Sequence, residues 1–368
     1  MPTPDGVLWD REPHTEAKHR LYRLYLQAWF PILLRTFPRG VTYAEGFAGP
    51  GEYTGGDPGS PLIALRTALL AQPGPNKDRP AYFIMVEKNR RRLEHLRHVL
   101  TRELGDLRSE ALLRRGLVID LRSGDCEDIL PDLLARHRAH TRPLLVVLDT
   151  FGSAVSFSLL RHVAASQGAE VIVTIQPQHF ARFASDPNHF GDRVFGPTVW
   201  RDVQTRPSHE KADYIRTRYR RTVQEAGFRY VLDFELADEK NNLLYLVYGT
   251  NHRTGVVKMK DAMWSVDPIS GIGYRDPRDP RQQMLPFDLA ADTAPLRRLL
   301  LEHLTGLPTY RATVGELHEF TLLGTIYKAT HTTAAVASLM ADKKLRNVTG
   351  GRLTAASTVE PTGIEPLF

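Results

Sequence analysis

The segment EGFAGPG, from Glu45 to Gly51, decides the fold of this chain. It ends a short apolar run, Gly40 to Ala48, that is typical of a buried strand, and a helical pattern beginning with Ser60 follows it. Gly49 and Gly51 let the backbone approach a ligand closely, and open α/β sheets bind nucleotides at the carboxyl ends of their strands. This order therefore predicts a cofactor site after the first strand, although a tight turn without a ligand is the alternative interpretation.

The rest of the first 250 residues alternates between strand and helix patterns. Continuous apolar runs separated by helical patterns predict a parallel sheet covered on both faces, which is a doubly wound, Rossmann-like α/β fold. Closely spaced strands then predict antiparallel strands at the sheet edge. The expected parallel strands follow the first at 81–87, 116–125, 143–152 and 169–177, and the expected edge strands lie at 228–239, 242–252 and around 256–259.

The chain is expected to divide into four parts. Residues 1–36 form an N-terminal helical segment, residues 37–266 the sheet domain, and residues 267–290 a linker rich in proline, glycine and charge. Three helical patterns and a Gly-Gly hairpin in residues 291–368 predict a winged-helix-like domain. Such domains bind DNA or mediate protein contacts, and the sequence favours neither.

Composition excludes several classes of protein. The chain has 368 residues and 42% hydrophobic residues, and its 48 basic and 42 acidic residues give a net charge of +6. This mild excess permits contact with a polyanion, but a solvated basic surface would have the same composition. The single cysteine, Cys126, excludes an internal disulfide and multi-cysteine metal sites. Because there is neither a signal-peptide pattern nor an apolar stretch of about 20 residues, we expect a cytoplasmic protein without membrane contact.

Acidic residues end four successive predicted strands, at Glu45, Glu87, Asp125 and Asp149. Four acids at one rim would repel a polyphosphate, whereas they suit a cofactor with a cationic centre and free hydroxyls. S-adenosylmethionine has both features. The sequence therefore predicts this cofactor, held by Glu45, Phe47, Gly49, Gly51, Glu87, Asp125 and Cys126.

The order of these motifs also resembles a known family. EGFAGPG, GSPLIAL, FIMVEK, GDCEDIL and VLDTFG together resemble class I S-adenosylmethionine-dependent methyltransferases and, more narrowly, the three-Cys-motif partner proteins. A leading helix with Thr15, Lys18 and His19 and the later segment Thr250 to Trp264 extend the resemblance over most of the chain. The resemblance implies a methyltransferase-like fold and a partner that carries a three-cysteine motif and is related to radical-cofactor enzymes.

The fourth strand ends in Asp149-Thr150-Phe151-Gly152. This tetrapeptide resembles the (D/N)-P-P-(Y/F) signature of methyltransferases that act on base amines, with Thr150 in place of the first proline. The resemblance implies that Asp149, Thr150 and Phe151 orient the methyl acceptor. The alternative interpretation is that Asp149 caps the strand and Phe151 is a core ring.

Three functional hypotheses follow from these patterns. The first is a methyltransferase acting on a nucleic-acid base, with Lys18, His19 and Gln178 near the substrate and a basic helix from Arg206 to Arg221 near the entrance. The second is an adaptor for the three-cysteine partner, with or without the cofactor. The third is a metal-dependent nuclease or hydrolase that uses the rim acids, although the scattered histidines predict no metal site.

Overall fold

The computed structural model describes residues 6–72, 78–150, 153–184, 191–196, 199–238, 242–275 and 291–363. It contains two compact units: Met1–Lys258 with Gly273–Gln283, and Met259–Ile272 with Met284–Phe368. The division falls inside helix α10 (Arg253–Val266), whereas the sequence analysis placed it after residue 266. Phe151 and residues 276–290 of the expected linker lie outside the described residues.

The first unit is built on an eight-stranded sheet with the order β3-β2-β1-β4-β5-β7-β6-β8. Strands β1 to β5 are parallel, whereas β7 runs antiparallel to both β5 and β6. The predicted doubly wound, Rossmann-like sheet with antiparallel edge strands is therefore confirmed. Its strand order reverses between β1 and β4, which is where such sheets bind ligands. The strands are β1 (Val41–Glu45), β2 (Ala81–Glu87), β3 (Leu117–Ser123), β4 (Leu144–Leu148), β5 (Ala169–Ile175), β6 (Tyr230–Ala237), β7 (Leu243–Thr250) and β8 (Gly273–Arg275).

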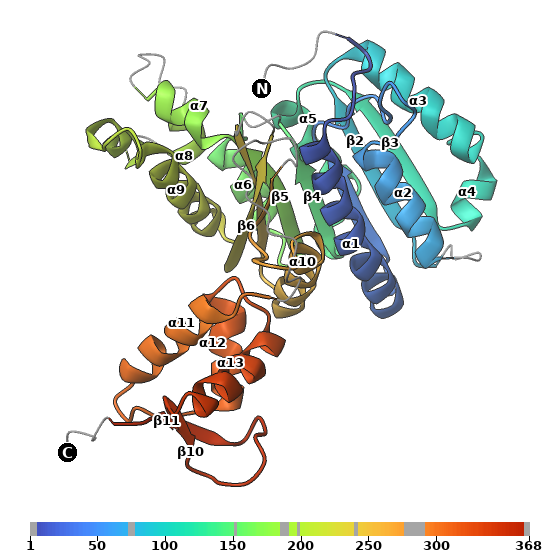
Figure 1. The fold of residues 1–368 in the computed structure, drawn as a ribbon. Coiled ribbons are helices and arrows are strands. Elements are labelled where there is room, and N and C mark those ends of the chain that lie inside the picture. Colours follow the sequence, from blue (N-terminus) through green and yellow to red (C-terminus); the bar gives the residue numbers. More distant parts are fainter. Residues whose placement is uncertain are drawn as a thin grey trace. The chain divides into compact units, whose positions relative to one another are not determined.

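Helices cover both faces of this sheet (Figure 1). On one face, Phe30 of α1 packs against the rings of Tyr43 and Phe83, and α1 lies beside α2. On the other face, α5, α6 and α9 share a hydrophobic core with the strands. Each strand can contribute to both cores because its alternate side chains point to opposite faces of the sheet. Pro31 lies inside α1 and does not end it. The helices of this unit are α1 (Pro13–Thr36), α2 (Ser60–Ala71), α3 (Arg90–Leu104), α4 (Glu110–Arg114), α5 (Cys126–Arg136), η1 (Ala139–Thr141), α6 (Phe157–Ala164), α7 (Pro177–Arg182), α8 (Asp192–Phe195), η2 (Val199–Thr205) and α9 (Lys211–Ala226).

One expected edge strand is a helix. The segment around Val256 to Met259 was predicted as a strand, but it belongs to α10. Val256, Met259 and Met263 are buried, and their spacing of three and four residues is that of one helix face. The strand was predicted from a short apolar run alone. Over the whole segment the apolar residues recur with the spacing of a helix, which so short a run cannot show. None of the described helices is long and apolar enough to cross a bilayer.

The second unit contains three helices and a small antiparallel sheet with the order β10-β11-β9. Its core brings together Leu300, Leu317, Val336 and Trp264, the last of these from the end of α10. The sequence predicted the three helices and a two-stranded hairpin but not the third strand, β9, and the winged-helix interpretation stays a prediction. The elements are α11 (Ala294–Thr305), β9 (Ala312–Thr313), α12 (Val314–Gly324), α13 (Ala329–Ala341), β10 (Leu345–Asn347) and β11 (Thr358–Pro361).

A buried lysine closes the end of α12 in this unit. Lys260 is fully buried, and its Nζ donates to the carbonyl oxygens of Thr321, Leu322, Thr325 and Tyr327 at 3.3, 2.5, 2.6 and 2.9 Å. The last carbonyls of a helix have no partner within the helix, and they carry partial negative charge. Burial lowers the pKa of Lys260 to about 7, whereas the surrounding oxygens favour its protonated form. This side chain therefore ties α10 to the turn after α12.

Candidate functional site

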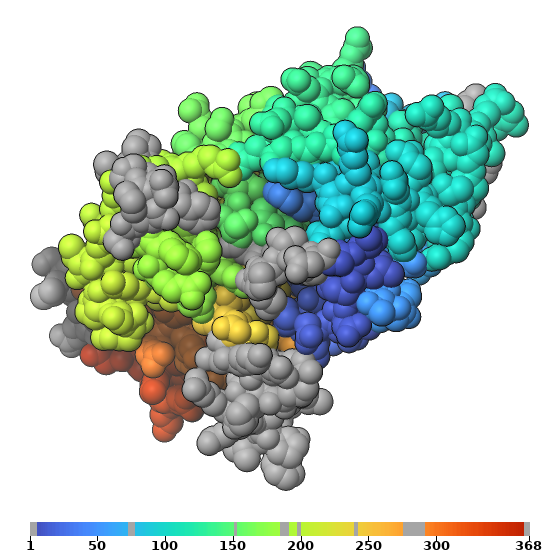
Figure 2. Space-filling view, turned by 90° about the horizontal axis from the view of Figure 1, so that it is seen from above, coloured from blue at the N-terminus to red at the C-terminus, as the bar shows by residue number. Residues whose placement is uncertain are grey.

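A cavity of about 630 Å³ lies at the carboxyl ends of β1, β2, β3 and β4. Figure 2 looks down on the molecule from above, where blue, cyan and green atoms surround a hollow. Most of the residues that the sequence assigned to the cofactor or the acceptor line the cavity. They are Lys18, His19, Phe47, Gly49, Gly51, Glu87, Asp125, Cys126, Asp149 and Thr150.

The loop after β1 approaches the cavity closely because of its glycines. Gly49 and Gly51 have φ angles of 64° and 89°, in the left-handed region that glycine adopts without strain. A Cβ at Gly46 would lie 2.3 Å from the Sγ of Cys126, so only glycine fits between this loop and α5. The loop therefore contributes glycine backbone to the cavity wall at Gly46, Gly49 and Gly51, as a cofactor-binding turn requires.

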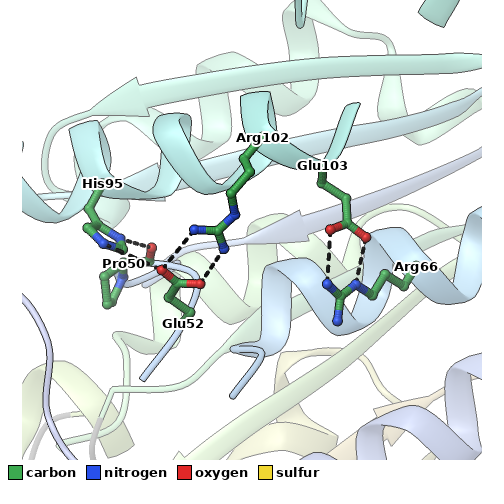
Figure 3. Close-up of polar contacts among 6 residues, drawn as sticks. All are labelled: Pro50, Glu52, Arg66, His95, Arg102 and Glu103. Carbon is green, nitrogen blue, oxygen red and sulfur yellow. Dashed lines mark hydrogen bonds and ion pairs between the residues drawn. The ribbon is translucent and has the colours of Figure 1, made fainter. Parts of the chain in front are cut away.

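Ion pairs hold the same loop against α3, as Figure 3 shows. Glu52 accepts from Arg102 at 2.6 Å, and the Nδ1 of His95 lies 3.0 Å from the carbonyl oxygen of Pro50. Next to them, Arg66 of α2 pairs with Glu103 of α3 at 2.7 and 2.9 Å. The middle and the C-terminal end of α3 thus contact the glycine loop, and the C-terminal end also contacts α2.

Glu87 joins the loops that follow β1 and β2. Its Oε2 accepts from the backbone N–H of Gly49 at 2.9 Å, and its Oε1 accepts from that of Asn89 at 2.8 Å. An ionised carboxylate offers about four acceptor positions. Two positions therefore remain on a side chain that lines the cavity.

Asp125 and Cys126 begin α5 at the third wall. Asp125 caps this helix by accepting from the backbone N–H of Glu127 at 3.0 Å, and its other oxygen lies 3.0 Å from the Nζ of Lys88. The Lys88 hydrogen bond lowers the pKa of Asp125 below its usual value. Burial raises the pKa of the Cys126 thiol far above its usual value, which favours the protonated, weakly nucleophilic form.

Comparison with solved structures finds matches of low sequence identity, and two of them are methyltransferases. No protein-family model matches the chain, and no curated protein matches it. Among solved structures, geranyl diphosphate methyltransferase in complex with GPP and sinefungin is 11% identical, with a TM-score of 0.28 over 61% of this chain and 78% of that one. The B. subtilis M1A22 tRNA methyltransferase TrmK is 7% identical, with a TM-score of 0.28 over 84% and 92%.

One wall of the cavity carries a buried ion pair. The Nζ of Lys18, on α1, donates to Asp149, which also accepts from the Oγ1 of Thr174 at 3.0 Å. Burial acts to raise the pKa of Asp149, but the Lys18 charge and these hydrogen bonds bring it below its usual value. Asp149 is therefore an ionised acceptor at the cavity, from the strand end where the sequence expected it.

Thr150 lines the cavity, but its backbone N–H and its side-chain hydroxyl both form hydrogen bonds within the protein. Its backbone N–H donates to Thr174 Oγ1 at 3.0 Å, and its Oγ1 accepts from the N–H of Ala154 at 2.9 Å. These bonds join Thr150 to Thr174 and Ala154 without the proline of the methyltransferase signature. Phe151 lies outside the described residues.

His19 lies beside the ion pair and is neutral. It is buried, and its Nε2 lies 3.4 Å from the hydroxyl of Tyr53. Burial, together with the charge of Lys18, lowers the pKa of His19 to about 3. At neutral pH this side chain thus offers a polar but uncharged surface to the cavity.

Glu45 differs from the other three rim acids, because it does not line the cavity. It shares a face of β1 with Tyr43, whose hydroxyl donates to it, and Ser60 Oγ donates to its other oxygen at 2.8 Å. Burial raises the pKa of Glu45 to about 8. Glu45 is therefore a buried carboxyl that lies outside the lining of the cavity.

The raised pKa of Glu45 has a measurable effect on stability. Between about pH 4.5 and pH 8 the folded chain binds more protons at Glu45 than the unfolded chain, so its contribution to stability falls as the pH rises. We expect the unfolding free energy of the native chain minus that of Glu45→Gln to decrease steadily across this window, because the glutamine side chain does not titrate. Urea unfolding at intervals from pH 4.5 to pH 8.5 measures it, and a pH-independent difference would contradict this assignment.

Trp9 is a cavity residue that the sequence analysis missed. Its ring lies edge-on to Tyr53, with centroids 5.9 Å apart, and the guanidinium of Arg92 lies 5.0 Å from its ring centre. The backbone of Trp9 accepts from the N–H of Thr54 at 3.0 Å, which docks the N-terminal segment on the glycine loop. In the sequence, Trp9 is a single large aromatic residue in a polar segment. No helix or strand pattern includes it, so the sequence did not predict where its side chain lies.

Two other predicted substrate features lie apart from the cavity. Gln178 is exposed on α7 and does not line it. On α9, Arg216 and Arg220 pair with Asp233, and Arg218 pairs with Glu225, so much of the basic helix stabilises its own unit. Within the described ranges, no three His, Cys, Asp or Glu side chains are grouped as a metal site.

Proposed function

We propose that the chain is an S-adenosylmethionine-dependent methyltransferase. The observation that carries this proposal is the convergence of Glu87, Asp125 and Asp149, from three strand ends, on one cavity walled by the glycine loop. Its volume, about 630 Å³, is in the range of small-molecule sites. The reversal of strand order beside it is the usual ligand position in doubly wound sheets.

The residues present fit this cofactor. Glu87 retains two acceptor positions for vicinal ribose hydroxyls, and its bonds to Gly49 and Asn89 hold its carboxylate in place. Cys126 provides a small, uncharged surface next to Asp125, which suits an adenine ring. The cofactor supplies an electrophilic methyl group on a sulfonium, so the protein needs mainly to align an acceptor with it.

The acceptor that we favour is a nucleic-acid base. Asp149 is an ionised acceptor, and it is available to receive a hydrogen bond from a base amine. Lys88 and Arg92 line the same cavity and would attract the phosphates on either side of that base. Asp149 would orient the amine, and Lys18 would keep Asp149 ionised and in position.

Transfer of labelled methyl groups tests this function. The purified chain is incubated with labelled S-adenosylmethionine and, separately, with DNA, tRNA and rRNA that lack the modification. We expect label in one nucleic acid, at an exocyclic or ring nitrogen of a base. Absence of label in all three, with cofactor binding intact, would contradict the nucleic-acid acceptor.

A second candidate is an adaptor that binds the cofactor, or has lost it, and serves a three-cysteine-motif protein. The observation that favours it is the replacement of the signature proline by Thr150, whose side chain is used within its own turn. An adaptor would co-purify with its partner and transfer no methyl group. The transfer assay and a pull-down with the three-cysteine protein distinguish the two functions.

A further inference from the structure

A second cavity, of about 550 Å³, lies at the opposite end of the sheet. Its walls come from the C-terminal half of α1, the segment before β4, the start of β5 and the start of α10. Helix α1 reaches both cavities, since Lys18 lines the first, and Tyr25 and Trp29 line the second. The methyltransferase proposal uses none of the residues of this second cavity.

One wall of the second cavity is apolar. Trp29, Ile32, Leu33 and Phe37 line it along α1. Ile32 is 36% exposed and Phe37 is 42% exposed, so large apolar surface is open to solvent here. Several neighbouring apolar side chains that line a hollow are typical of a site for an apolar ligand group.

The single acid of this cavity is already used by the protein. Glu170 accepts from Tyr25 Oη at 2.6 Å, Trp29 Nε1 at 2.7 Å, Tyr248 Oη at 2.9 Å and Thr250 Oγ1 at 3.0 Å. Four donors fill the acceptor positions of a carboxylate. Glu170 thus orders the aromatic wall and has no position left for a ligand cation.

The remaining ionisable groups that line the second cavity are basic. They are His140, Arg142, His252 and Lys258, and they lie on the two segments that face α1. Arg142 is 9% exposed; its guanidinium donates to the carbonyl oxygen of His137 and lies 3.8 Å from the ring centre of Tyr82, while its buried Nε has no hydrogen-bond partner among the described residues. The charges of Arg142 and Lys258 in the lining therefore favour an anionic over a cationic ligand group.

We propose that this second cavity binds an amphipathic anion: an apolar chain or ring that ends in a carboxylate or another acidic group. The apolar part lies along α1, against Ile32, Leu33 and Phe37. The acidic end faces Lys258 and Arg142. Charge complementarity favours an anionic over a cationic ligand. A cationic ligand would lie near four basic side chains, and the only carboxylate in the described lining, Glu170, has no free acceptor position to bind it.

Calorimetry with decanoate and with decanol, both below their aggregation limits, tests the proposal. We expect decanoate to bind the native chain at least tenfold more tightly than decanol. Ile32→Asp should weaken decanoate binding at least tenfold, whereas Leu70→Asp, an equally drastic change at a leucine that is 79% exposed on α2, should not. Lys258→Ala should reduce the preference for decanoate over decanol.

A further variant separates the two cavities. Glu87→Ala alters the first cavity alone, so it should leave decanoate binding unchanged. Loss of binding in Glu87→Ala with normal binding in Ile32→Asp would place decanoate in the first cavity and overturn the proposal. No heat with the native chain, or equal affinity for decanoate and decanol, would overturn it as well.

Discussion

Asp149→Ala is expected to abolish methyl transfer and to lower the free energy of unfolding by about 3–5 kcal/mol. The stability loss follows from the burial of its partner, because the side chain of Lys18 is only 8% exposed and would keep its charge without a counter-ion. Thr174 would also lose its acceptor at 3.0 Å. Urea unfolding and the labelled-methyl assay measure the two effects.

A double variant separates the two roles of Asp149. Combining Asp149→Ala with Lys18→Met removes both charges, so much of the lost stability should return. Methyl transfer should stay at least about 100-fold below the native rate, because the acceptor would still lack its orienting carboxylate. Asp132→Ala, an exposed acid on α5, is the matched control and should change neither quantity.

Recovery of activity in the double variant would mean that Asp149 acts only as the counter-ion of Lys18. In that case the acceptor would have to be oriented by other groups on the cavity wall. A native-like stability of Asp149→Ala would instead contradict the buried ion pair itself.

Much of the sheet could be predicted from the sequence because its strands are buried on both faces. A continuous apolar run such as Ala81 to Glu87 has few alternatives when helical patterns precede and follow it. The segment around Val256 was predicted wrongly because its three apolar residues, Val256, Val257 and Met259, are too few to distinguish a strand from a helix. The buried contacts of Lys260 were equally out of reach, since they depend on carbonyls more than 60 residues away.

The site could be predicted to the level of strand ends but not to the direction of each side chain. Glu87 and Asp149 line the cavity as expected, whereas Glu45 is turned toward Tyr43 and Ser60. Successive side chains of a strand point to opposite faces of the sheet, so each acid points either into the cavity or into the core. Which of the two faces Glu45 takes depends on how β1 packs against α1 and α2, and the sequence alone does not give that packing. Trp9 was missed for a similar reason, because its position depends on a docked segment without regular structure.

Glu87 is the residue on which the cofactor assignment depends most. Its alanine variant would lose the ligand hydrogen bonds and free the N–H groups of Gly49 and Asn89, which now fix the two loops. Hydrogen bonds to a charged group contribute about 1.5–3 kcal/mol each, so the loss of two predicts a decrease in affinity of about 100-fold or more. Glu94→Ala, at an exposed acid on α3, is the matched control.

Calorimetric titration with S-adenosylhomocysteine, the cofactor product, is the most direct measurement. The account predicts one site per chain with micromolar affinity, retained in Glu94→Ala and lost in Glu87→Ala while the variant keeps its circular dichroism. Absence of heat with the folded native chain, or equal affinity in Glu87→Ala, would contradict the claim that this cavity holds an adenosyl cofactor.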